Sequence, residues 1–213
     1  HLFEEAVQAG VTIEKIFALE SYRDQLATFP QTVWVSEEIL RDLADTQTPQ
    51  GIVAVIQKEE MGQPDLRQGK FLFLEDVQDP GNVGTMIRTA DAAGFTGVIV
   101  SDKSADVYSL KTLRSMQGSH FHLPIYRMPV ATFVEGAKKS DLPILATTLS
   151  RDSKDYRELS PLEDFVLVMG NEGQGISSVM AESADQLVHI SMKGRAESLN
   201  VAVAAGILMF YFS

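Results

Sequence analysis

The residues best suited to chemistry lie in a glycine-rich stretch from Phe165 to Ser177, which reads FVLVMGNEGQGIS. It opens with five apolar residues, and a run this short and rich in valine predicts a strand buried on both faces. Three glycines then fall within six residues, and they allow positive φ and a close approach of backbone to ligand. A helix-compatible pattern follows from Ile176 to Ala184. The stretch predicts a strand, a binding loop and a helix.

The charge of this loop restricts its ligand. Its spacing, GxxGxG, matches neither the dinucleotide fingerprint nor a P-loop, since no Gly-Lys-Ser/Thr follows. Glu172 would repel a pyrophosphate from a loop of inward-facing amides, so a neutral or cationic ligand is favoured. S-adenosylmethionine, a sulfonium without phosphate, is one such ligand. Taken alone, however, the loop fits a plain strand-to-helix turn better than a ligand site.

Two further stretches complete a set of three motifs. Upstream, Leu74 to Phe95 contains DPGNVGTMIRTA, and downstream, Ile190 to Leu208 contains SLNVAVA. Together with MGNEGQG they closely resemble, in the right order, the three motifs of the SpoU (TrmH-like) RNA ribose 2′-O-methyltransferases. The resemblance runs from about Phe71 to the C-terminus. Three specific motifs in order make a chance match a poor explanation.

The resemblance implies an enzyme that uses S-adenosylmethionine to methylate a ribose 2′-hydroxyl in RNA, with ribosomal RNA expected ahead of transfer RNA. It also implies a cytoplasmic homodimer whose active site is completed near the interface. Neither a metal nor a membrane is expected as a partner. Two other classes of function stay open: a non-catalytic RNA-binding relative, and a nucleotide-dependent oxidoreductase. The complete set of motif residues argues against the first, and the missing phosphate fingerprint argues against the second.

Five polar positions match the family's site residues and form the expected catalytic group: Asn82, Arg88, Glu172, Ser198 and Asn200. The resemblance implies that Arg88 activates the 2′-hydroxyl. A guanidinium has a pKa above about 12 and normally only donates hydrogen bonds. We therefore expect Arg88 to hold the adjacent phosphate and the developing alkoxide; whether it also takes the proton stays open. Simpler roles are an Arg88–Asp91 ion pair, helix capping by Ser198 or Asn200, and an amide contact for Glu172.

The remaining site residues also follow from the resemblance. The expected cofactor-binding positions are Gly170, Gly173, Gly175, Ile190, Met192 and Leu199. The expected RNA contacts are Lys111, Arg114, Ser115 and Arg195. His120 and His122 are expected on one strand face, but no third ligand is evident nearby, so no metal site is predicted. One departure is Ser191, which stands where the family commonly has proline.

Alternating strand and helix patterns after Phe71 predict an α/β fold, a mostly parallel sheet with helices on both faces. The resemblance adds a C-terminal trefoil knot and a small α/β N-terminal domain. We expect an RNA substrate-binding domain over residues 1–57, incomplete at its N-terminus, a polar linker over 58–70 and the knotted methyltransferase domain over 71–213. Strands are expected near 15–19, 32–35, 52–56, 71–74, 97–100, 143–146, 165–169 and 187–190.

Charge and composition set further limits. The net charge of −11 argues against non-specific binding of RNA over the whole surface, so RNA must be held by a local basic patch. The segment Arg151 to Arg157 is either such a contact or a solvated loop whose acids neutralise its bases. The absence of cysteine excludes disulfides, thiolate nucleophiles and cysteine-based zinc sites. No apolar run reaches the roughly 18 to 20 residues that span a bilayer.

Overall fold

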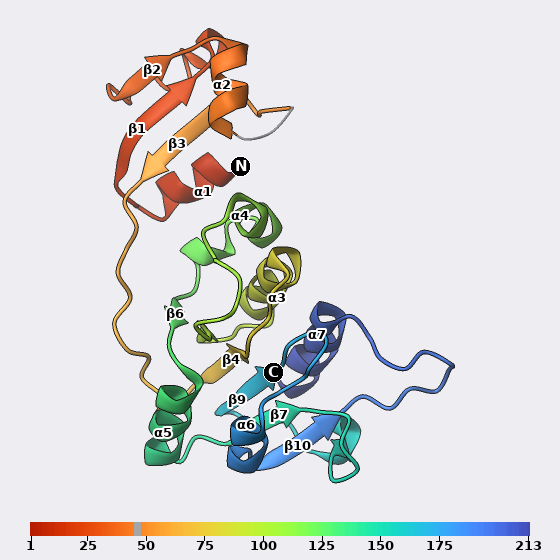
Figure 1. Cartoon of the computed structure of the whole chain (residues 1–213). Coiled ribbons are helices and arrows are strands. Elements are labelled where there is room, and N and C mark those ends of the chain that lie inside the picture. The colour runs from red at the N-terminus through yellow and green to blue at the C-terminus, as the bar shows by residue number, and fades with distance from the viewer. Residues whose placement is uncertain (45–47) are drawn as a thin grey trace. The chain divides into compact units, whose positions relative to one another are not determined.

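The structure is a computed structural model that describes residues 1–44 and 48–213. It divides into two compact units, His1–Glu60 and Met61–Ser213 (Figure 1). The stretch 58–70 was expected to be a linker, but its last residues belong to the second unit. Leu66 is 8% exposed and packs in a core of that unit, and Lys70 is the first residue of a strand. No helix among the described residues is long and apolar enough to cross a membrane.

The first unit is a three-stranded sheet with the order β2-β1-β3. β1 pairs parallel with β2 and antiparallel with β3, and its residues Ile16 and Ala18 pack with Leu26 in a small core. The elements are α1 (Leu2–Gln8), β1 (Ile13–Ala18), the 3-10 helix η1 (Glu20–Tyr22), β2 (Thr32–Trp34), α2 (Glu37–Ala44) and β3 (Ile52–Ile56).

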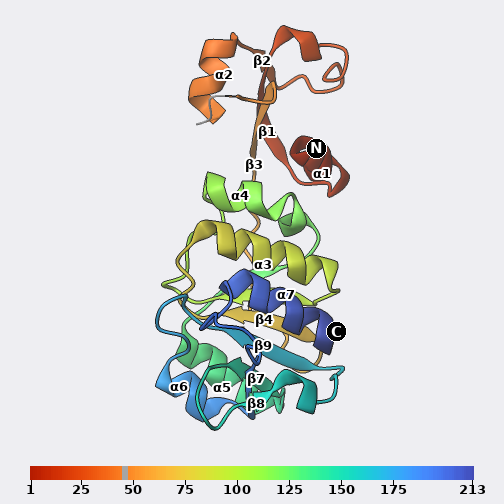
Figure 2. The same cartoon turned by 90° about the vertical axis from the view of Figure 1, so that its right-hand side faces the viewer.

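The second unit is a seven-stranded sheet with the order β6-β5-β4-β9-β7-β10-β8, in which every neighbouring pair is parallel. In Figure 2, the labelled strands β4, β9, β7 and β8 follow one another in this order. Its strands are β4 (Lys70–Leu74), β5 (Gly97–Val100), β6 (Ile125–Arg127), β7 (Ile144–Thr147), β8 (Lys154–Asp155), β9 (Phe165–Met169) and β10 (Gln186–His189). Its helices are α3 (Pro80–Ala92), α4 (Leu110–Met116), α5 (Val130–Ser140), α6 (Ser178–Ser183) and α7 (Val201–Phe212), with 3-10 turns η2 (Ser119–Phe121) and η3 (Tyr156–Glu158).

Side chains of the central strands alternate between two cores. In β4, Leu72 and Leu74 pack with α3 and α7, whereas Phe71 and Phe73 pack with α5. All five residues of β9 are buried. This two-sided burial explains why the strands read as continuous apolar runs, and it confirms the prediction of a parallel sheet with helices on both faces. The trefoil knot stays a prediction.

One local expectation was wrong: residues 119–121 form η2, so His120 and His122 do not share a strand face. Two others hold in part. The segment Arg151 to Arg157 contains β8 and the buried Asp155, although its four other charged residues are exposed. Of the two candidate caps of the last helix, Asn200 is the N-cap, and Ser198 lies before it. Two of these elements, β8 and η2, are short segments whose conformation depends on the sheet and helices that they contact.

Candidate active site

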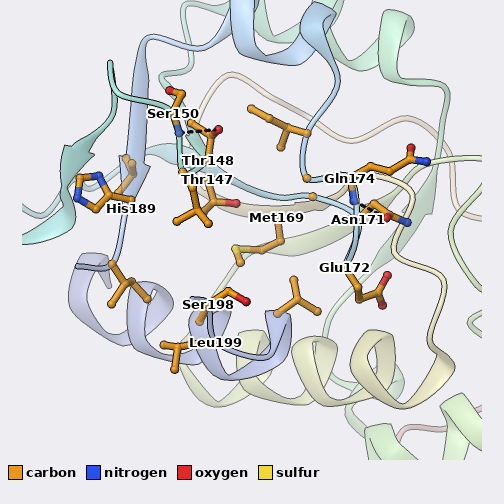
Figure 3. Close-up of a pocket in the computed structure, with 18 of the residues that line it drawn as sticks. Thr147, Thr148, Ser150, Met169, Asn171, Glu172, Gln174, His189, Ser198 and Leu199 are labelled. Carbon is orange, nitrogen blue, oxygen red and sulfur yellow. Dashed lines mark hydrogen bonds between the residues drawn. The ribbon is translucent and has the colours of Figure 1, made fainter. Parts of the chain in front are cut away.

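A pocket of ≈ 570 Å³ lies where β7, β9 and β10 end (Figure 3). Its walls come from the loop after β7, the glycine loop after β9, the end of β10 with the residues that follow it, and the start of α7. The lining residues fall within 147–150, 169–176, 188–192 and 198–208. The carboxyl ends of parallel strands are the usual place for a ligand in such a sheet.

The glycine loop folds back on itself and needs its glycines for space. Asn171 and Gly175 exchange two backbone hydrogen bonds of 3.0 and 2.9 Å, and the Asn171 Oδ1 atom accepts bonds from the amides of Gly173 and Gln174. A Cβ atom at Gly170 would overlap the carbonyl carbon of Gly175, which itself has φ +70°. The loop is therefore a closed turn that brings backbone atoms to the pocket wall.

Glu172 connects this loop to the first motif. Its carboxylate accepts hydrogen bonds from the amides of Gln78 (3.2 Å) and Asp79 (3.1 Å) and from the Asn82 side chain (3.1 Å). Partial burial raises the pKa of Glu172, but these donors and its own amide outweigh that effect and lower the pKa. Glu172 is thus held ionised, as an anchor between two loops.

Two further contacts join the same pair of loops. The Asn171 side chain donates a hydrogen bond of 2.8 Å to the carbonyl of Asp76. Glu75, which is 2% exposed, accepts a hydrogen bond of 3.0 Å from the amide of Ser177. Together with Glu172, these side chains brace the first-motif loop against the second-motif loop.

Asn82 brings the third motif into the cluster. The Asn200 side chain donates a hydrogen bond of 3.1 Å to the Asn82 Oδ1 atom, while its own oxygen accepts bonds from the amides of Ala202 and Val203. Asn200 therefore caps α7 and contacts the first motif with the same amide group. Asn82, bonded to both Glu172 and Asn200, is the point where the three motifs meet.

The structure places the predicted residues in different surroundings. All six expected cofactor positions line the pocket, as do Glu172 and Ser198. Arg88 lies six residues after Asn82, on the exposed side of α3, outside the pocket lining. The simpler alternative for Arg88, an ion pair with Asp91, is not observed, because Asp91 pairs with His122 at 2.8 Å.

The expected RNA contacts lie on α4 and in the third-motif segment. Lys111 and Arg114 are exposed on α4, and the Lys111 ammonium pairs with Asp79 at 2.9 Å, which helps to lower the pKa of that carboxyl group. The Ser115 hydroxyl donates a hydrogen bond to the carbonyl of Lys111. Arg195 lies in the exposed segment 191–200. Among the described residues, no group of His, Cys, Asp or Glu is placed to hold a metal ion.

Sequence reasoning missed one wall of the pocket. Thr147, Thr148, Leu149 and Ser150 line it from the end of β7, and His189 lines it from β10. No motif marks these residues. Their position in the pocket could nevertheless have been predicted, because the carboxyl ends of neighbouring parallel strands share one edge of the sheet. The residues that follow the strand expected at 143–146 should therefore lie at the same edge as the glycine loop.

Comparisons with known proteins agree with this geometry. Residues 69–210 match the SpoU rRNA Methylase family, and residues 1–54 match the MRM3-like substrate binding domain. The 23S rRNA (guanosine(2553)-2′-O)-methyltransferase RlmP of Bacillus subtilis is 40% identical over 213 residues, which cover 99% of this chain and 85% of that protein. The chain belongs to the SpoU rRNA methylase family. This confirms the family predicted from the three motifs.

Solved structures of SpoU-family relatives share the fold. The AdoMet-bound rRNA methyltransferase from Sinorhizobium meliloti has a TM-score of 0.88 and 33% identity, over 99% of this chain and 83% of that one. The SpoU methyltransferase AviRb from Streptomyces viridochromogenes, in complex with the cofactor AdoMet, has a TM-score of 0.83 and 30% identity, over 99% and 85% of the two chains. Both similarities span nearly the whole of this chain.

Proposed function

We propose that this chain is a methyltransferase that moves a methyl group from S-adenosylmethionine to a ribose 2′-hydroxyl in RNA, with ribosomal RNA as the substrate. One observation carries the proposal: the pocket formed by the glycine loop lies directly beside the cluster in which Asn82 joins all three motifs. Family membership and relatives with bound AdoMet support the same activity. A cytoplasmic location is the one that fits such a substrate.

The pocket suits S-adenosylmethionine. When bound, this cofactor supplies an electrophilic methyl group on a sulfonium. Gly170, Ile190 and Leu199 offer backbone atoms and apolar contacts for the nucleoside, while Gly173, Gly175 and Met192 complete the wall. The only carboxylate in the lining, Glu172, is already bonded to two amides and Asn82, and no Lys or Arg side chain lines the pocket. A phosphate-free cofactor fits this lining better than a dinucleotide.

Arg88 acts on the ribose by charge and orientation. The described residues offer it no ion pair, and its exposed position on α3 leaves the guanidinium available to a phosphate and to the oxygen that loses its proton. Asn82 and Asn200, each with amide hydrogen-bonding groups, lie next to the pocket and help to orient the acceptor nucleotide. Ser198 lines the pocket just before α7 begins. Glu172 holds the loops in place, since its lowered pKa makes it a poor proton acceptor.

RNA binding rests on a local surface of the second unit. Lys111, Arg114 and Ser115 on α4 and Arg195 in the third-motif segment would contact phosphates. Lys111 has to exchange or share its Asp79 partner when it does so. We assign residues 1–57 to a substrate-binding domain, 58–70 to a linker and 71–213 to the catalytic domain. Residues 1–60 contain 4 Lys or Arg and 11 Asp or Glu, so the first unit contributes little phosphate affinity.

The homodimer is supported by an apolar face on α7. Val203, Ile207 and Phe210 are 52%, 37% and 60% exposed and, being four and three residues apart, lie on one face of the helix. An obligate interface would bury on the order of 2,000 Å² or more. Light scattering at micromolar concentration should give a dimer for the unchanged chain and a monomer for Phe210→Glu. A monomer in both cases would contradict the proposal.

The deciding experiment follows labelled methyl groups from S-adenosylmethionine into purified ribosomal and transfer RNA from cells that lack this protein. Nucleoside chromatography then identifies the product. We expect label in a 2′-O-methylated nucleoside of ribosomal RNA. Label only in transfer RNA would move the substrate to the other branch of the family. If neither RNA is labelled while the cofactor still binds, the chain is a non-catalytic binding protein or uses a different acceptor.

A further inference from the structure

A hydrogen-bonded cluster lies where β8 and β10 run side by side, next to the pocket wall. β8 pairs parallel with β10, with Asp155 opposite His189. Ser153 and Ser191 lie two residues from these positions, and residues two apart on a strand share one face. The cluster is thus built from alternate positions of two neighbouring segments. Of its members, His189 lines the pocket.

The hydrogen bonds of the cluster define the tautomer of His189. Its Nδ1 atom lies 2.9 Å from the Ser153 hydroxyl, and its Nε2 atom lies 3.2 Å from the Ser191 hydroxyl. The Ser153 hydroxyl already donates its single hydrogen to the carbonyl of Ser150, at 2.6 Å. It must therefore accept from His189, which places the proton of the neutral ring on Nδ1. The Ser191 hydroxyl then donates to Nε2.

Ser191 anchors the cluster to β8 with its backbone as well. Its amide donates to the Asp155 carboxylate at 3.3 Å, and that carboxylate also receives two hydrogen bonds from the Arg157 side chain, of 2.7 and 2.8 Å. A proline at position 191 has neither this amide hydrogen nor a hydroxyl. Ser191 thus supplies two donors that a proline would lack: its hydroxyl to the His189 Nε2 atom and its amide to Asp155.

The cluster connects two walls of the pocket. Ser150 and the rest of Thr147–Ser150 line one wall, and Val188, His189, Ile190 and Met192 line another. The first wall is held to β10 by the amide of Thr148, which donates to the carbonyl of Val188 at 3.0 Å. The chain Ser150–Ser153–His189 adds a second connection through side chains. His189 therefore adds a side-chain connection beyond the pairing of β7 with β10, at the point where Thr147–Ser150 leaves the sheet.

We propose that His189, held between Ser153 and Ser191, is a positioning residue that fixes the wall Thr147–Ser150 against the end of β10 and so sets the affinity of the pocket for S-adenosylmethionine. This inference rests on the proposed function. As a positioning residue, His189 would act on cofactor binding and leave the methyl-transfer step unchanged. Loss of one or two neutral hydrogen bonds predicts a change in affinity of about three- to tenfold.

The test uses the full chain and a graded set of variants. His189→Ala and Ser191→Pro should raise the calorimetric Kd and the KM for S-adenosylmethionine about three- to tenfold, with kcat within about twofold of the unchanged chain. Ser191→Ala keeps the amide donor and should have a smaller effect. Ser191→Thr, which keeps both donors, should restore the affinity. His122→Asn changes a histidine outside the pocket lining and serves as the matched control.

Nitrogen-15 NMR of the unchanged chain gives a second readout that requires no variant to fold. The His189 ring should show a protonated Nδ1 and an unprotonated Nε2 in its neutral form; the opposite tautomer would overturn the proposed geometry. Equal Kd values for all variants, or a loss of kcat at constant KM, would overturn the proposed role of His189 and leave the proposed function of the chain intact. If the unchanged chain failed to bind S-adenosylmethionine, the proposed function itself would be wrong.

Discussion

The three motifs meet at one site, but two of its regions are built differently. The junction of the first and second motifs is cross-braced by side chains that bond to backbone groups of the opposite loop: Glu75, Asn171 and Glu172. The third-motif segment 191–200 is exposed at every residue except Met192. It reaches the first motif through the Asn200–Asn82 hydrogen bond.

This difference separates two tasks within one site. The hydrogen bonds of the braced junction hold the walls of the cofactor pocket in place, which reduces the cost of ordering it on binding. An exposed segment has few contacts within its own unit, so its conformation is available to be stabilised by RNA or by a second copy of the chain. Changes in the junction should therefore affect folding and cofactor binding together, whereas changes at exposed side chains that bond to no other part of the unit should affect turnover with little loss of stability.

The largest effect is expected from Gly170→Ala in the junction. The added Cβ would overlap the backbone of Gly175, and the closed turn has no flexible side chain there that could move aside. Overpacking of this kind typically costs about 1–3 kcal/mol, and we also expect S-adenosylmethionine binding to be lost. Thermal unfolding and calorimetry measure both effects. Gly173→Ala is the matched control for the unfolding measurement, because the nearest neighbour of its added Cβ would be the Asn171 side chain at 3.7 Å. Equal melting temperatures of the two variants would show that the turn is not closed in solution.

Arg88→Ala, at an exposed position on α3 that has no part in the braced junction, should give the opposite pattern. Since Arg88 is exposed and has no ion pair among the described residues, its removal should leave the melting temperature unchanged. The loss of a group that stabilises developing charge should lower kcat about 10²-fold or more. Methyl-transfer assays at saturating RNA separate this from weakened RNA binding. Near-normal turnover with a raised KM for RNA would leave Arg88 only a binding role.

These two residues also show how far the sequence leads. The closed glycine turn was predictable, because three glycines after an apolar run carry a local signal. The partner of Asp91 was not. Asp91 pairs with His122, 31 positions away in the sequence, although Arg88 is only one helical turn away. The choice between these two partners depends on the packing of η2 near α3, which the sequence does not reveal. For the same reason the two-residue strand β8 could not be predicted from the sequence. Its side chains are polar and show no apolar pattern, and it is a strand because it pairs with β10.

Glu172→Gln should disturb the brace without adding bulk. A glutamine side chain places an NH2 group where the carboxylate now faces two amides and Asn82, so at least one of these donors loses its acceptor. We expect a loss of about 1 kcal/mol, which is about 2–4 °C in Tm for a protein of this size. Scanning calorimetry measures it, with Gln174→Glu on the exposed tip of the same loop as the control. No change in Tm would mean that these hydrogen bonds add nothing beyond those to water.

Asn200 allows capping to be separated from contact with the first motif. Asn200→Ala removes the N-cap of α7, at a cost of about 1 kcal/mol, together with the bond to Asn82. Asn200→Asp keeps an oxygen for the amides of Ala202 and Val203 but has no hydrogen to donate to Asn82. We expect the aspartate variant to have the same Tm as the unchanged chain. Its turnover should be reduced as much as that of the alanine variant. If the aspartate variant were fully active, the link between these motifs would be only structural.

The smallest effect concerns the anchor of the His189 cluster and its dependence on pH. The Arg157 guanidinium, and then Ser191, hold the pKa of Asp155 far below its usual range. A carboxyl group whose pKa is lower in the folded state adds stability at pH values above its unfolded pKa, near 3.9, and loses it as the pH falls. The Tm advantage of the unchanged chain over Asp155→Asn should therefore be full at pH 7 and shrink between about pH 5 and pH 3. Asp102→Asn, at an exposed site, controls for the change in net charge. An advantage that stayed constant down to pH 3 would mean that Asp155 contributes through shape and neutral hydrogen bonds, since its charge would then have no part in holding β8 to the pocket wall.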